Sequence, residues 1–198
     1  MLPENCTSGL RELRVFKARQ NALRSLESGL FGNLTHLQCA DISRNRISAV
    51  GPGLLSNVPH LRQIDLGSNN ITTMSADVWK VLCHTGNVDI SSNQIAVLPS
   101  FLALQNTSVR SFALYNNPLR CTAENAWMLD WLKSLGPRLV TGLCAPVACG
   151  SPPWLRDRDI LQLSDADFYR NPNSERIQLI FEVCLSLFSC VNRQSICH

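Results

Sequence analysis

The sequence predicts an α/β solenoid of short repeats, with a curved, parallel β-sheet on its concave face and a helical cap at its C-terminal end. Two observations lead to this prediction. Asparagines and apolar residues recur every 24 residues through the first part of the chain. After the last of these asparagines the regular spacing stops, and a segment containing Trp and Cys follows. Self-similarity at a short fixed period is typical of stacked repeats that bury a continuous core between them.

Composition places the chain among ordinary globular proteins. It has 198 residues, of which 45% are hydrophobic and 17% charged, and its net charge is +3. These values argue against disorder and collagen-like structure, and the charge is too small to suggest a nucleic-acid binder. No stretch reaches the ~20 apolar residues that a membrane-spanning helix needs. The nine Cys are an odd number, so at least one thiol is unpaired in a monomer.

Residues 1–12 match the second half of a repeat and lack its strand. The sequence MLPENCTSGL has no basic region followed by an apolar one, so it does not match a signal peptide. It also offers no polar or disulfide-linked cap for that end of a solenoid. We therefore expect the chain to be a fragment that begins inside a longer series of repeats.

Residues 13–116 form the predicted repeats. Each repeat reads LxxLxLxxNxLxxL followed by ten less regular residues. The LxL pair places two side chains on one face of a short strand, where they point into the core. The Asn side chain can bond backbone groups at the following bend, so stacked Asn residues form a ladder. The ladder residues are Asn21, Asn45, Asn69, Asn93 and Asn117.

Residues 117–170 form the predicted cap. Thr122 can begin a helix, and Gly136-Pro137 can end it. Trp127 and Trp131 are four residues apart, so they share one face of that helix and can cover the open end of the core.

Residues 171–198 are a divergent tail whose apolar residues follow helical spacing from Ile177 to Val191. A membrane-associating or partner-binding amphipathic helix is one interpretation of the tail. The interpretation that we favour is an end unrelated to the rest of the domain.

The repeats resemble the 24-residue class of leucine-rich repeats that is common in extracellular proteins. After them, the segments NPLRC (117–121) and CGSPPWL (149–155) resemble parts of the C-terminal cysteine-rich cap of those proteins. The resemblance implies a non-enzymatic protein–protein recognition module. Its parent would be a secreted or cell-surface receptor, adhesion or matrix protein, with roles such as signal transduction. An intracellular scaffold or enzyme regulator built on the same repeat is the alternative.

The cap departs from the family pattern in its cysteines. The family cap carries four Cys in two disulfides, and the second and fourth positions here are Ala123 and Arg170. The resemblance therefore implies that one bridge is lost and that Cys121–Cys149 remains, with Cys144 as another candidate partner for either. A reduced cap without bridges is also open, although disulfides belong to secreted proteins.

Four N-x-[ST] sequons favour the secretory pathway and a glycoprotein. They begin at Asn5, Asn33, Asn70 and Asn106, and each Asn could instead be an ordinary loop residue. We expect an extracellular or cell-surface location.

The candidate binding residues are the outward-facing positions of the predicted strands and the turns after them. They form a strip that is basic at one end, acidic in the middle and aromatic at the other end. Its members are Val15, Lys17, Arg19, Asp41, Ser43, Arg44, Gln63, Asp65, Asn87, Asp89, Ser91, Ser111 and Tyr115. Tyr115 is the best single anchor, because aromatic residues are frequent among those that carry binding energy. We expect another protein to bind this concave face, no nucleic acid to bind, and membrane contact only through segments missing from this chain or weakly through the tail.

Two sets of ionisable residues occupy equivalent positions in successive repeats, and each set has more than one interpretation. Asp41, Asp65 and Asp89 could attract a basic partner or Ca²⁺, or could have a structural role in the repeat. His36, His60 and His84 could bind a metal, but zinc prefers tetrahedral convergence to a straight row, so we expect them to face solvent.

No catalytic group can be named from the sequence. Cys39 is a candidate free thiol with nothing nearby in the sequence to activate it. No nucleophile elbow, phosphate loop, HExxH or CxxC motif is present. The sequence thus predicts neither an enzyme nor a cofactor or metal site.

Overall fold

The structure is a computed structural model that describes residues 7–140, 142 and 146–170. Asn5, Cys144 and the tail 171–198 lie outside the described residues, so the predictions made for them remain predictions.

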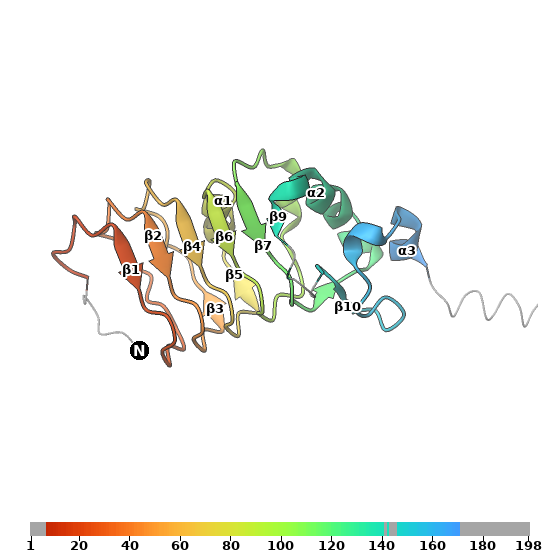
Figure 1. Cartoon of the computed structure of the whole chain (residues 1–198), viewed down its shortest axis with the longest axis horizontal. Coiled ribbons are helices and arrows are strands. Elements are labelled where there is room, and N and C mark those ends of the chain that lie inside the picture. Colours follow the sequence, from red (N-terminus) through yellow and green to blue (C-terminus); the bar gives the residue numbers. More distant parts are fainter. Residues whose placement is uncertain (1–6, 141, 143–145, 171–198) are drawn as a thin grey trace, which may run out of the picture.

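A six-stranded parallel sheet runs the length of the repeats (Figure 1). Its strands, in spatial order, are β1 (Val15–Lys17), β2 (Cys39–Asp41), β4 (Gln63–Asp65), β6 (Asn87–Asp89), β7 (Ser111–Ala113) and β9 (Leu139–Val140). The first five strands pair residues that are 24 positions apart, as Phe16 with Ala40 and Ala40 with Ile64. The parallel sheet that the spacing predicted is therefore confirmed, whereas its curvature stays a prediction.

The strands alternate between core and surface as their sequence indicates. The central residues Ala40, Ile64, Val88 and Phe112 are at most 2% exposed. Each strand is short because the chain turns soon after it, at a non-glycine residue with positive φ. These residues recur every 24 positions, at Gln20, Arg44, Ser68, Ser92 and Asn116. The left-handed conformation redirects the chain immediately before each ladder asparagine.

The asparagine ladder is present and joins each repeat to the one before it. Asn69 Oδ1 accepts a hydrogen bond from Ile47 N, and its Nδ2 donates to Ile42 O and Leu66 O. The same pattern recurs at three other ladder residues, Asn45, Asn93 and Asn117. All four are buried, so these bonds satisfy backbone groups that have no access to water.

The irregular part of each repeat forms several small elements. A second parallel pair joins β3 (Ala49–Val50) to β5 (Thr73–Met74). One repeat contains the helix α1 (Ala76–Leu82) and the next contains the 3₁₀ helix η1 (Ser100–Leu104). Helix α1 buries Val78, Trp79 and Leu82 on one side, which explains why a single repeat can form a short helix there.

A helix covers the core after the last repeat. The 3₁₀ turn η2 (Ala123–Asn125) leads into α2 (Trp127–Leu135), which ends at Gly136 as predicted. The Trp131 ring packs edge-on against Phe112, with centroids 5.7 Å apart, and is 5% exposed. Thr122 was predicted to begin this helix, but it begins η2 instead and its side chain accepts no bond from the backbone. The tighter 3₁₀ turn comes between Thr122 and α2, whose own N-cap is Ala126.

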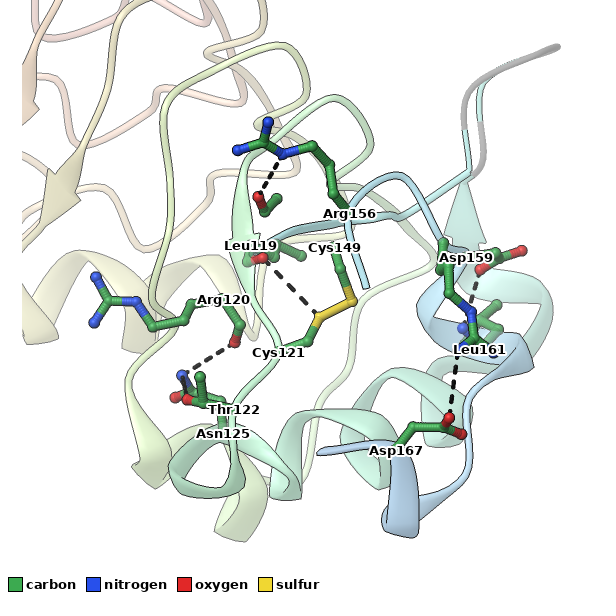
Figure 2. The surroundings of a disulfide bond; sticks show 12 residues. Leu119, Arg120, Cys121, Thr122, Asn125, Cys149, Arg156, Asp159, Leu161 and Asp167 are labelled. Atoms are coloured by element: carbon green, nitrogen blue, oxygen red, sulfur yellow. Dashed lines mark hydrogen bonds and ion pairs between the residues drawn. A yellow bond between two sulfur atoms is a disulfide. The ribbon is translucent and has the colours of Figure 1, made fainter. Parts of the chain in front are cut away.

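The C-terminal segment adds a strand to the main sheet and a disulfide beside it. The 3₁₀ turn η3 (Gly136–Arg138) leads into β9, which pairs with β7. Farther on, β10 (Cys149–Ser151) pairs with β8 (Leu119–Arg120), and Cys149 is bonded to Cys121 with Cα atoms 5.8 Å apart. Figure 2 shows this bridge between the two strands.

The chain then continues through η4 (Ile160–Gln162) and α3 (Asp165–Tyr169). Among the described residues, none of the helices is both long and apolar enough to span a membrane.

Candidate functional site

The outward side of the six-stranded sheet, with the turn that follows each strand, is here called the exposed sheet face. Most of the predicted binding residues lie on it with accessible side chains. The well-exposed members are Val15, Lys17, Arg19, Arg44, Gln63 and Asn87, and the half-buried members are Asp41, Asp65, Asp89, Ser111 and Tyr115. The structure thus brings these residues, which are far apart in the sequence, to one side of the sheet.

Two predicted members, Ser43 and Ser91, do not belong to this face. They are 3% and 4% exposed, and each hydroxyl donates a hydrogen bond to the aspartate two residues earlier, at 2.6 Å for Asp41 and 2.7 Å for Asp89. The prediction extended the alternation of the strand past its end. The chain already turns at these serines, so their buried hydroxyls bond the aspartates instead of facing solvent.

Asp41, Asp65 and Asp89 form an acidic row across three neighbouring strands. They are in register, Asp41 opposite Asp65 and Asp65 opposite Asp89. Each Oδ1 accepts a hydrogen bond from the backbone N–H two residues later, that of Ser43, Gly67 or Ser91. The sequence left open a structural role for these three aspartates, and the structure shows that they have one. The hydrogen bonds hold each carboxylate in a fixed position.

Arg19 is the cation beside this row. Its Nη1 lies 3.8 Å from Asp65 Oδ2 and 4.0 Å from Asp41 Oδ2, and it donates a hydrogen bond to Ser43 Oγ at 3.1 Å. The Arg19 side chain is 45% exposed, so water screens both ion pairs and they contribute little to stability. Asp89 has no ion pair among the described residues.

The acidic row alters the protonation of its central member. Burial raises the pKa of Asp65 above its ordinary value, and the negative charges of Asp89 and Asp41 raise it further. The hydrogen bond from Gly67 N is second only to burial and lowers the pKa, as does the Ser43 side chain, but the pKa stays above its ordinary value. The charged form of Asp65 therefore destabilises the folded protein relative to the protonated form.

A hollow of about 380 Å³ lies at the β1 end of the face. It is lined by Val15, Phe16, Lys17, Cys39, Ala40, Asp41, Gln63 and Asp65. The prediction did not include this hollow. The only sequence signal for it is Ala40, which is smaller than Phe16, Ile64, Val88 and Phe112 at the same place in the other repeats.

The thiols and the predicted disulfide are found in distinct environments. Cys121 and Cys149 are bonded and at most 1% exposed. Cys39 is free and half-buried in the hollow of the exposed sheet face. Cys83 is free and buried, and burial raises its pKa to about 11, so its thiol is not activated.

The remaining predicted residues are the sequon asparagines and the histidines. Asn33, Asn70 and Asn106 are exposed and lie outside the strands. The three histidines are exposed, with the His36 and His60 rings 6.3 Å apart, which agrees with a solvent-facing column. Within the described ranges, no group of three or more His, Cys, Asp or Glu residues could hold a metal ion.

The comparison with known proteins identifies the repeat. Residues 40–82, which include β4, Asp41 and Asp65, match the family model of the leucine rich repeat. This segment contains a leucine-rich repeat. Leucine-rich repeat domains generally mediate protein–protein interaction, and the match suggests a non-enzymatic recognition module. No curated protein matches the chain.

Proposed function

We propose that this leucine-rich repeat domain is a non-enzymatic recognition module that binds another protein through its exposed sheet face. The in-register acidic row supports this proposal most strongly. Hydrogen bonds to the backbone fix Asp41, Asp65 and Asp89 before any partner arrives. A surface that needs little ordering loses little entropy on binding, and fixed charges select a partner of complementary charge.

The two ends of the face supply different chemistry. Lys17 and Arg19 make the β1 end basic, and the half-buried Tyr115 follows β7 at the other end. The Tyr115 ring packs partly against the core, so its orientation is restrained while one part stays accessible. An anchored aromatic ring of this kind is a typical centre of binding energy.

We further propose an extracellular or cell-surface location, in a receptor, adhesion or matrix protein. The buried Cys121–Cys149 bridge and the resemblance of its surroundings to a cysteine-rich cap support this. The exposed sequons at Asn33, Asn70 and Asn106 lie outside the strands, so glycans there would leave the strands of the exposed sheet face uncovered. Free Cys121 and Cys149 thiols in protein from secreting cells would favour the intracellular alternative.

The binding proposal is tested with variants that change the face and spare its hydrogen bonds. Proteins captured on the domain are identified, and the affinity of each direct binder is measured for Gln63→Arg, Tyr115→Ala and the control Lys80→Glu on α1. We expect Gln63→Arg and Tyr115→Ala to weaken binding by about tenfold or more. Gln63→Arg changes the centre of the exposed sheet face, and Tyr115→Ala removes its aromatic anchor. Melting temperatures should stay close to that of the wild type. Normal binding by both face variants, together with loss in the control, would place the interface elsewhere.

A further inference from the structure

Arginines line the rim of the six-stranded sheet at which its strands begin. The strands lie side by side and run in the same direction, so the residues that precede them form a line across the sheet (Figure 1). Arginine directly precedes four of the six strands, and the neutral residues Gln38 and Gly86 precede the other two. These four arginines are here called the basic rim: Arg14 before β1, Arg62 before β4, Arg110 before β7 and Arg138 before β9.

Backbone hydrogen bonds between the strands keep the basic rim in line. Gln38 N donates to Arg14 O, and Arg62 N donates to Gln38 O, each at 2.8 Å. Farther along the line, Arg110 N donates to Gly86 O at 2.6 Å. Adjacent strands are ~4.8 Å apart, so the backbones of Arg14, Arg62 and Arg110 follow one another at intervals of roughly 10 Å. The fold therefore spaces these cations evenly along the rim.

The guanidinium groups of the basic rim receive little charge balance from the protein. The side chains of Arg14, Arg62 and Arg110 are exposed, and none of them forms an ion pair within the part of the chain that the structure describes. Arg138 is half-buried and donates to three backbone carbonyl oxygens, which leave its positive charge in place. Three exposed cations of the rim are thus available to an anionic ligand.

The nearby acidic residues do not cancel the basic rim. Glu12 lies two residues before Arg14, and the ion pair that it forms is with His36, at 3.9 Å. The acidic row of the exposed sheet face lies three residues farther along the strands, which corresponds to roughly 10 Å. Exposed charges separated by this distance are largely screened from each other at physiological ionic strength. The basic rim is therefore a positive strip separate from the acidic row.

We propose that the basic rim binds a sulfated polysaccharide, an extended chain with many sulfate groups, and that successive sulfates pair with Arg14, Arg62 and Arg110. This surface is separate from the exposed sheet face, so the proposal goes beyond the proposed function and requires no protein partner. A guanidinium presents its N–H donors in a planar fork, which matches the oxygens of a sulfate as it does those of a phosphate. Because the sheet holds the arginines along one path, a chain with many sulfates can bind several of them at once.

The residues around the basic rim favour a polysaccharide over other anionic chains. The four residues before each strand of the main sheet include no Phe, Tyr or Trp, whereas proteins bind single-stranded nucleic acids largely by stacking bases on aromatic rings. The same segments contain no exposed large apolar residue, although such residues commonly anchor protein partners. A sulfated polysaccharide needs neither feature, because charge-assisted hydrogen bonds to its sulfates supply the attraction.

The test uses a heparin octasaccharide as the probe, and the same octasaccharide without its sulfate groups for comparison. Binding of each to the whole chain is measured by isothermal titration calorimetry at several salt concentrations. We expect the desulfated probe to bind at least about tenfold more weakly than the sulfated one, because it lacks the groups that pair with the arginines. The affinity of the sulfated probe should fall as the salt concentration rises, since its binding releases counterions.

Charge variants at two places on the molecule locate the site. Arg62→Gln combined with Arg110→Gln should lower the affinity about tenfold, and should reduce the slope of log affinity against log salt concentration by about 2. Gln38→Glu places a negative charge within the line of the rim and should weaken binding about threefold. The matched control is Arg24→Gln combined with Arg46→Gln, which removes two exposed arginines beyond the other ends of β1 and β2. The control changes the net charge equally and should bind normally.

Several results overturn the proposal. These are equal binding of the two octasaccharides, no heat of binding up to about 1 mM sulfated probe, or equal affinities of the rim double variant and the control when thermal melts show both to be folded. A polyglutamate peptide and an oligothymidylate of matched charge complete the experiment. If either binds as tightly as the sulfated octasaccharide, the basic rim attracts anionic chains in general and the assignment of a polysaccharide is wrong.

Discussion

Single residues of the asparagine ladder join the repeats to one another. Asn69 bonds Ile47 N and Ile42 O of the preceding repeat and is 6% exposed. Asn69→Ala should lower the free energy of unfolding by roughly 2–4 kcal/mol, because it leaves several buried backbone groups without partners. Urea denaturation measures this. Asn21→Ala is the control, since Asn21 is exposed and, within the described part of the chain, its side chain bonds only Ala18 O and Arg19 O of its own repeat. Equal losses in the two variants would contradict a joining role.

The protonation of Asp65 links the exposed sheet face to stability. Burial raises its pKa in the folded state, so the folded protein binds this proton more readily than the unfolded chain. The charged carboxyl therefore lowers stability above the raised pKa, and this penalty disappears as the pH falls below the ordinary value of about 3.9. Asp65→Asn, which keeps an acceptor for Gly67 N, should be more stable than the wild type at pH 7 and similar to it near pH 3. Calorimetry at the two pH values checks this, and a less stable variant at pH 7 would refute it.

Helix α2 is the element that closes the core after the last repeat. Trp131 packs on Phe112, but its buried Nε1 has no acceptor among the described residues. Trp131→Ala should cost about 3–5 kcal/mol through the cavity that it leaves. Trp131→Phe should cost clearly less, because it keeps most of the ring contact and removes a buried donor without a partner. Chemical denaturation distinguishes the two variants, and an equal loss would mean that the indole N–H has a role.

The strands of the repeats could be predicted from the sequence, and several other elements could not. The 24-residue spacing defines which residues pair, so β1, β2, β4, β6 and β7 and the buried ladder follow from it. Strand β9 (Leu139–Val140) lies outside the spacing and joins the sheet only because α2 brings the chain back beside β7. The inward position of Ser43 depends on the turn after the strand, where strand alternation no longer applies.

The Cys121–Cys149 bridge stabilises the whole molecule by joining the strands β8 and β10 near its C-terminal end. Its loop spans 28 residues, which in the loop-entropy model is worth roughly 3–4 kcal/mol. Cys121→Ser with Cys149→Ser should lower the melting temperature accordingly, whereas Cys39→Ser, at a free thiol, should not. Because both bonded cysteines are buried, reductant should cleave the bridge slowly below the melting temperature. Rapid reduction in the native state, followed by mass spectrometry of alkylated thiols, would contradict the buried bridge.

Hydroxyl-radical footprinting of the domain bound to a captured protein tests most directly whether the exposed sheet face is the interface. Mass spectrometry compares side-chain oxidation in the free and bound states at Tyr115 and Cys39 on the face and at Leu104, which is 87% exposed and lies in η1 outside the sheet. The account predicts that binding protects Tyr115 and Cys39 and leaves Leu104 unchanged. Protection of Leu104 with unchanged oxidation at both face residues would contradict it.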